Sequence, residues 1–169
     1  MNKLIRILDN TIAWIMISLM VVLVIVVTWQ VFTRYILGEA SSFSEETARF
    51  LLIWIGLLGA AYAYKQNMHL AFDLFINKAT GMRKFWMEIF IHLLIAFFSI
   101  LVLIIGGYYL VQLTWELNQL SASLQVPLAY VYTALPLSGV IIVIYSAWFI
   151  REIITKGPIE QKPQIDEVA

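Results

Sequence analysis

The chain has 169 residues, of which 62% are hydrophobic and only 13% are charged. This composition, with a mean hydropathy of +0.85, is typical of a helical membrane protein and leaves no room for a separate soluble domain. The formal net charge is zero, so nothing favours nucleic-acid binding. Cysteine is absent, which excludes disulfides, thiolate metal sites and a cysteine nucleophile.

Four long apolar stretches predict an all-α membrane protein with four transmembrane helices. About 20 apolar residues, at about 1.5 Å each, cross about 30 Å of hydrocarbon. The expected spans are approximately residues 12–33, 43–64, 85–110 and 127–150. We expect them to form one membrane domain over residues 1–156, followed by a flexible tail over 157–169.

The first span has basic residues before it, as a signal peptide does. Its uncharged stretch runs from Asn10 to Arg34, however, which is too long for a signal peptide, so we expect a retained span.

The second span begins unusually, because only residues 50–64 are free of charge. The helix must therefore start earlier, near Phe43. Ser42 and Glu45 fit a capping box, in which a serine and a glutamate three residues later satisfy the first amides of a helix.

Glycine and proline predict the packing of the third and fourth spans. Gly106 and Gly107 allow a neighbouring backbone to approach closely. Pro127 suits a first helical turn, and Pro136 inside the span predicts a kink. Residues 112–126 either extend the third span or form a short helix on the membrane surface.

Lysine and arginine predict the orientation. Nine of the 11 basic residues lie in the N-terminal segment, between spans two and three, or in the C-terminal tail. Only Arg34 and Arg49 lie on the other side, so both termini should be cytoplasmic.

Residues 65–79 form a polar and an apolar face at helical spacing, with His69 and Asp73 on the polar face. This pattern predicts an amphipathic helix in the membrane interface between spans two and three. A docking surface for a partner subunit is the alternative, and both interpretations are compatible.

A charged cluster at the outer ends of spans one and two is the best candidate site. It contains Arg34, Glu45, Glu46 and Arg49, so that two positive and two negative charges cancel. Glu45 and Arg49 are four residues apart and share a helix face. The cluster is either a polar contact within the chain or a contact with another protein, because buried charges need partners. No nucleophile or base accompanies it, so we expect no enzyme activity.

The second span is also rich in small residues. Gly56, Gly59 and Ala60 allow close helix packing, either within the chain or against a larger partner. Trp54 lies deeper than the other tryptophans, which form an aromatic belt near the span ends, and it is a candidate interface residue.

Several of these motifs resemble the small membrane subunit of tripartite ATP-independent periplasmic (TRAP) transporters. The similarity covers about residues 29–75. Span one ends in an arginine and an aromatic residue, Arg34-Tyr35, and span two begins with two glutamates, Glu45-Glu46. A Leu-Gly-Ala-Ala segment follows at residues 58–61, and the next loop contains His69 and Asp73. Phe43 replaces the usual tryptophan, and Asn67-Met68 stands where the family often has glycines.

The resemblance implies a bacterial inner-membrane subunit without catalytic, substrate, metal or cofactor sites of its own. Its partners would be a large elevator-type membrane subunit, a periplasmic binding protein that docks transiently, and the lipid bilayer. Such systems import organic acids with a sodium gradient, here sialic acid or a C4-dicarboxylate.

Two other functions compete with this one. The first is a membrane anchor for a haem or quinone redox enzyme, which would use His92 as the only histidine inside a span. The second is a self-sufficient exporter or channel, which usually needs an ionisable group at mid-membrane, and none lies there in this sequence.

Overall fold

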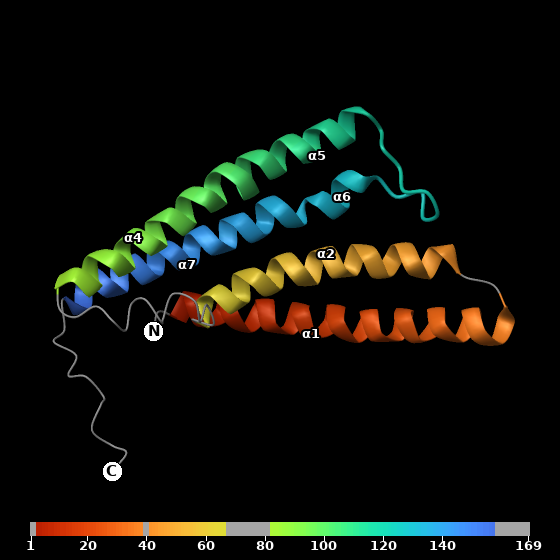
Figure 1. The fold of residues 1–169 in the computed structure, drawn as a ribbon, viewed down its shortest axis with the longest axis horizontal. Helices are drawn as coiled ribbons and strands as arrows, with labels where there is room; N and C mark the ends of the chain where they lie inside the picture. The colour runs from red at the N-terminus through yellow and green to blue at the C-terminus, as the bar shows by residue number, and fades with distance from the viewer. Residues whose placement is uncertain (1–2, 39–40, 67–81, 158–169) are drawn as a thin grey trace, which may run out of the picture.

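The computed structural model describes residues 3–38, 41–66 and 82–157, which form four long helices (Figure 1). The first is α1 (Lys3–Phe32), which continues into the π-helix η1 (Thr33–Leu37), and the second is α2 (Ser42–Lys65). The third comprises α4 (Met82–Phe98), the π-helix η2 (Ser99–Gly106) and α5 (Gly107–Glu116). The fourth comprises α6 (Leu128–Tyr132) and α7 (Ala134–Lys156).

All four are long and apolar enough to cross a membrane. The candidate spans are Ile5–Ile36, Ser42–Lys65, Met82–Glu116 and Leu128–Thr155. The predicted all-α fold with four transmembrane helices is therefore confirmed. The third helix has 35 residues and is about 52 Å long, so it extends well beyond a hydrocarbon core of about 30 Å.

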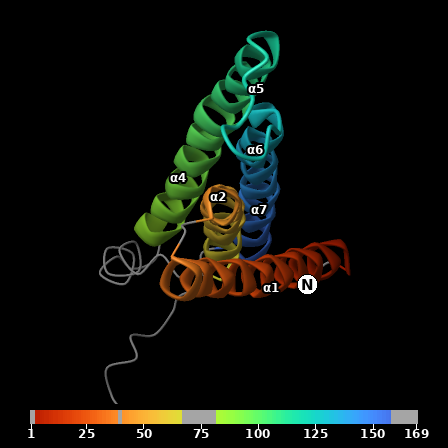
Figure 2. The ribbon, with the colours of Figure 1, turned by 90° about the vertical axis from the view of Figure 1, so that its right-hand side faces the viewer.

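The helices form two antiparallel hairpins, α1–α2 and α4–α7 (Figure 1). One end of the molecule holds the start of α1, the end of α2, the start of α4 and the end of α7, and we call it the terminal end. The opposite end, which we call the loop end, holds η1, the start of α2 and residues 117–127 between α5 and α6. The first and third helices separate towards the loop end (Figures 1 and 2).

The backbones pack in an open layer rather than a closed bundle. α1 packs on α2, α2 on α7, and α7 on α4 and η2. Consequently α7, the last of the described helices, lies between α2 and the third helix. The main buried cluster lies near the terminal end and includes Ile5, Ala61, Tyr145 and Phe149. The described part of the chain therefore has a small interior, and many large apolar side chains are exposed.

The start of α2 differs by one residue from the expected capping box. Ser41, not Ser42, is the N-cap, and its hydroxyl accepts a hydrogen bond from the Ser44 amide at 3.4 Å. Ser44 then occupies the third helical position, so a serine stands where the predicted box has Glu45. The predicted cap was wrong because consecutive serines offer two possible starts, and the backbone of Ser41 has the extended conformation that an N-cap requires.

The fourth span is interrupted near the position where Pro136 predicts a kink. The helix is interrupted at Thr133, between α6 and α7. Pro136 has no amide hydrogen to donate to the carbonyl of Tyr132, and its ring crowds that carbonyl, which explains the position of the break. Pro127 lies just before the helix, as the N-cap of α6.

The predicted close approach occurs at Gly107 but not at Gly106. A Cβ atom added to Gly107 would lie 2.9 Å from Leu135 Cβ and 3.0 Å from Pro136 Cδ. Gly139 of α7 is equally confined, since its added Cβ would lie 2.8 Å from Leu103 Cβ. The third and fourth helices thus cross at two glycines, one from each helix.

The outer segment extends the third span as far as Glu116, which is one of the two expected alternatives. A hydrogen bond of 2.8 Å joins Gln112 to Glu116 on its exposed surface. Residues 117–127 then form a loop. The expected interfacial helix falls mainly on residues 67–81, and most of the expected tail falls on 158–169; both lie outside the described residues, as do His69 and Asp73.

Candidate functional site

Glu46 joins the two hairpins at the loop end. Its carboxylate accepts hydrogen bonds from three consecutive backbone amides of the α5–α6 loop. The donors are Ala122 at 3.1 Å, Ser123 at 2.8 Å and Leu124 at 2.9 Å. Hydrogen bonds to an ionised acceptor are about twice as strong as neutral ones. Glu46 therefore anchors the loop to α2, although the two segments are more than 75 residues apart in sequence.

Local sequence places Glu46 at this position. The Ser41 cap starts α2 so that Glu46 lies in its second turn, next to the loop. A negative charge near a helix N-terminus is also stabilised by the helix dipole.

The other members of the charged cluster lie apart from this contact. Arg49 donates to Glu45 at 2.9 Å along one face of α2, and both side chains are more than half exposed. Arg34 is exposed in η1, and no ion pair of its side chain is seen among residues 3–38, 41–66 and 82–157. The structure thus joins only Glu45 to Arg49, while Glu46 binds a loop that the sequence argument had not linked to it.

A second polar cluster joins three helices near the terminal end. Tyr145 of α7 donates a hydrogen bond to one carboxylate oxygen of Asp9 in α1 at 2.6 Å. The other oxygen of Asp9 lies 3.8 Å from the ammonium nitrogen of Lys65, at the end of α2. Lys65 also lies 4.5 Å from the ring centre of Trp148, a cation–π contact. The Asp9 and Lys65 side chains are only 16% and 12% exposed, so each charge depends on the other.

His92 of α4 belongs to a third polar contact. Its Nδ1 lies 2.6 Å from the Tyr64 hydroxyl of α2, and its ring stacks on Phe149 of α7 at 4.8 Å. The backbone carbonyl of His92 accepts a hydrogen bond from the Ser146 hydroxyl at 2.5 Å. Thus His92, the candidate haem ligand of the redox alternative, is engaged in contacts between helices.

Trp54 and Gly59 lie on α2 between the two polar ends. Both are partly buried, and a Cβ atom added to Gly59 would lie 3.5 Å from the methyl group of Met16. Gly59 therefore faces α1. Gly56 and Ala60, by contrast, are exposed, and nothing lies within 4 Å of a Cβ added to Gly56.

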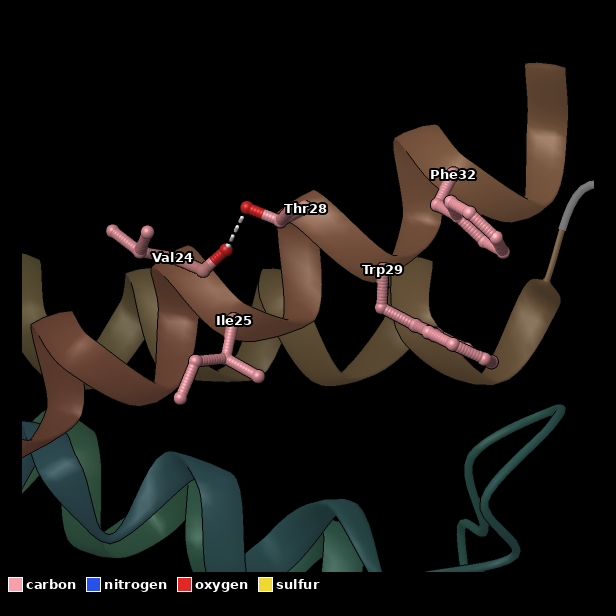
Figure 3. A pocket seen from close by; sticks show the side chains of 5 residues that line it. All are labelled: Val24, Ile25, Thr28, Trp29 and Phe32. Atoms are coloured by element: carbon pink, nitrogen blue, oxygen red, sulfur yellow. Dashed lines mark hydrogen bonds between the residues drawn. The ribbon is translucent and has the colours of Figure 1, made fainter. Parts of the chain in front are cut away.

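A shallow apolar depression of about 390 Å³ lies on α1 (Figure 3). Its lining consists of Val24, Ile25, Thr28, Trp29 and Phe32. Thr28 donates its hydroxyl proton to the Val24 carbonyl at 2.7 Å (Figure 3), so the depression presents an almost entirely apolar surface. Such a surface suits hydrocarbon rather than an organic acid.

Asp9, Lys65 and Tyr145 were not predicted from the sequence to form a site. One signal could have linked two of them: Asp9 and Lys65 lie near the terminal ends of the first and second spans, where an acidic and a basic side chain are expected to pair. Tyr145 lies well inside the fourth span, and no sequence signal connects it to them. No comparable signal exists for the amides of residues 122–124, because every loop has amides.

These contacts define a multi-pass helical membrane protein whose polar groups join its own helices. The family model for "Tripartite ATP-independent periplasmic transporters, DctQ component" matches residues 23–156, so the chain belongs to this family of transporter components.

Two relatives agree with this assignment. The chain is 38% identical over 73 residues to the sialic acid TRAP transporter small permease protein SiaQ of Vibrio cholerae, which covers 43% of this chain and 42% of that protein. It is 24% identical over 147 residues to a putative TRAP transporter small permease protein of Haemophilus influenzae. That alignment covers 84% of this chain and 86% of the relative. The chain thus aligns with less than half of the first relative and with most of the second.

Proposed function

We propose that this chain is the small membrane subunit of a sodium-coupled TRAP transporter in the bacterial inner membrane. It associates with a large elevator-type subunit and helps a periplasmic binding protein to dock at the loop end. Both termini face the cytoplasm. The chain enlarges and stabilises the static part of the complex and does not itself hold the transported acid.

The open helix layer is the observation that carries this proposal. Over residues 3–38, 41–66 and 82–157 the helices form a layer that encloses no pathway, and the depression on α1 is apolar. Asp9 and Lys65, two mostly buried charged residues, are paired with each other near the terminal end. In the part of the chain that the structure describes, no group of three His, Asp or Glu residues could hold a metal ion. Family membership supports the same role.

Transport by defined components tests this proposal. We expect proteoliposomes that contain both membrane subunits to accumulate the acid when a sodium gradient and the binding protein are supplied. Proteoliposomes that contain this chain alone should accumulate nothing. Accumulation by the chain alone would show that it carries substrate itself and would refute the proposal.

The exposed charges at the loop end are proposed contacts for the binding protein. Arg34, Glu45 and Arg49 are exposed and project from the end that would face the periplasm. Arg34→Glu should reduce uptake without reducing copurification of the two membrane subunits, because its side chain has no structural partner among the described residues. Lys3→Glu, at the exposed terminal end, is the matched control. Equal uptake by the two variants would exclude Arg34 from docking.

Four residues remain proposed as structural or partner-interface residues: Trp54, Gly59, His69 and Asp73. Gly59→Leu would test the structural role of Gly59, because the new side chain would displace Met16 of α1. We expect this variant to copurify less of the large subunit than Gly56→Leu if Gly59 maintains the hairpin shape that the partner recognises. If Gly56→Leu instead copurifies less of the large subunit than Gly59→Leu, the partner contacts the exposed face of α2 at Gly56.

Sialic acid is the proposed substrate, because the Vibrio cholerae relative is named as a sialic acid TRAP transporter subunit. Uptake of labelled sialic acid by cells that express the complete system should be lost when this chain is deleted. Unlabelled sialic acid should compete for uptake, whereas succinate should not. Uptake of labelled succinate, with no uptake of labelled sialic acid, would instead identify a C4-dicarboxylate system.

A further inference from the structure

The α5–α6 loop presents three consecutive backbone amides to one carboxylate. Ala122, Ser123 and Leu124 all donate to Glu46, with two bonds to one oxygen and one to the other. Successive amides that converge in this way form an anion-binding concavity, even without a positively charged side chain. Glu46 occupies this concavity from another helix.

The loop has internal hydrogen bonds that hold it in shape. The Ser121 amide donates to the Val126 carbonyl at 2.9 Å, and the Leu128 amide donates to the Gln119 carbonyl at 2.9 Å. The Ser121 hydroxyl accepts from the Val126 amide at 3.3 Å. Gln125 has a left-handed backbone with φ of 54°, which turns the chain between these contacts. These bonds are made within the loop, although the Ser121 hydroxyl also bonds the Glu46 carboxylate, so the concavity is formed largely by the loop itself.

The concavity is also open to water. Ala122 and Ser123 are exposed, and the loop projects beyond the ends of α5 and α6 (Figure 1). A small anion can therefore reach the three amides if the glutamate is absent.

We infer that residues 121–126 form a carboxylate-binding site in their own right, and that Glu46 is its tethered ligand. Tethering gives Glu46 a high effective concentration, so that it excludes free carboxylates in the native protein. A small free carboxylate, such as formate, should occupy the same site once Glu46 is shortened to alanine. This inference does not depend on the transport role.

Amide hydrogen exchange of the full-length chain in lipid nanodiscs tests the inference. In Glu46→Ala, residues 122–124 should exchange about tenfold faster or more, since each amide loses a charged acceptor. Formate should restore much of the protection, and chloride at equal ionic strength should not. Arg49→Ala is the matched control, because it removes an exposed ion pair one turn away and leaves the three amides bonded.

Glu46→Gln distinguishes an empty site from a damaged loop. Glutamine keeps the size of the side chain and one acceptor oxygen, so it should protect the amides partly and prevent any response to formate. Two outcomes would overturn the inference. The first is unchanged amide exchange of residues 122–124 in Glu46→Ala. The second is that formate protects these amides in Glu46→Ala no more than it does in Glu46→Gln, or no more than chloride does. If Glu46→Ala loses the loop structure so that formate cannot restore protection, the claim that the loop forms the site by itself is wrong.

Discussion

Replacing Gly107 with alanine should weaken the crossing of the third and fourth helices. The new Cβ would lie 2.9 Å from Leu135 Cβ, 3.0 Å from Pro136 Cδ and 3.1 Å from the Pro136 nitrogen. These are a Cβ, a proline ring atom and a backbone atom, none of which can rotate away. The helices must therefore separate to accept the methyl group.

The neighbouring Gly106 supplies a matched control for the loss of unfolding free energy. A Cβ added to Gly106 would meet only the Leu101 carbonyl oxygen at 3.6 Å, an ordinary contact. Both substitutions gain about the same helix propensity, up to about 1 kcal/mol. Overpacking costs about 1–3 kcal/mol and applies only to Gly107→Ala. The difference in unfolding free energy between the two variants should therefore be about 1–3 kcal/mol, with Gly107→Ala the less stable.

Reversible unfolding in mixed detergent micelles measures this difference. Increasing the fraction of dodecyl sulfate unfolds the helices, and circular dichroism follows the transition in the two variants and the parent. If Gly107→Ala is as stable as Gly106→Ala, then the two helices do not approach each other as closely as described, and the steric argument fails.

Three further substitutions test other contacts. Tyr145→Phe should lower the unfolding free energy by about 1.5–3 kcal/mol, because the Asp9 carboxylate loses a hydrogen bond from a buried hydroxyl. If the losses in unfolding free energy are strictly additive in a double-mutant cycle with Asp9→Ala, the contact does not exist. Arg49→Gln should change the unfolding free energy by less than about 0.5 kcal/mol, since its ion pair is exposed, and a larger loss would mean that the pair is buried in the assembled protein. Pro136→Ala should straighten the fourth helix, because the new amide can bond to the Tyr132 carbonyl. The chain has no native cysteine, so spin labels at residues 130 and 150 can report the distance, which should increase and would stay the same if the kink has another cause.

The sequence was sufficient to predict the features that depend on neighbouring residues. Hydrophobic length predicts four spans, and Pro136 predicts the interruption of the fourth, because an imino acid affects the helix turn that contains it. The cap of α2 was misplaced by one residue because Ser41 and Ser42 have the same chemistry.

The polar contacts between helices depend on tertiary structure and were not predicted. Tyr145 and Asp9 are 136 residues apart, and their contact exists only because α7 packs next to the first hairpin. Likewise, Glu46 was expected to belong to a charged cluster with Arg34, Glu45 and Arg49, but the α5–α6 loop offers it three amides. Every residue except proline has a backbone N–H, so the sequence of that loop does not distinguish it as an anion site.

The position of α7 has a consequence for biosynthesis. α7 packs against both α2 and α4, yet the ribosome makes it last of the four spans. When the third span enters the bilayer, its main neighbour has not yet been translated. The first hairpin can pair at once, whereas the third span must wait in lipid until the fourth inserts beside it. Translation that stops before α7 would therefore leave the third span without its docking surface, exposed to membrane quality control.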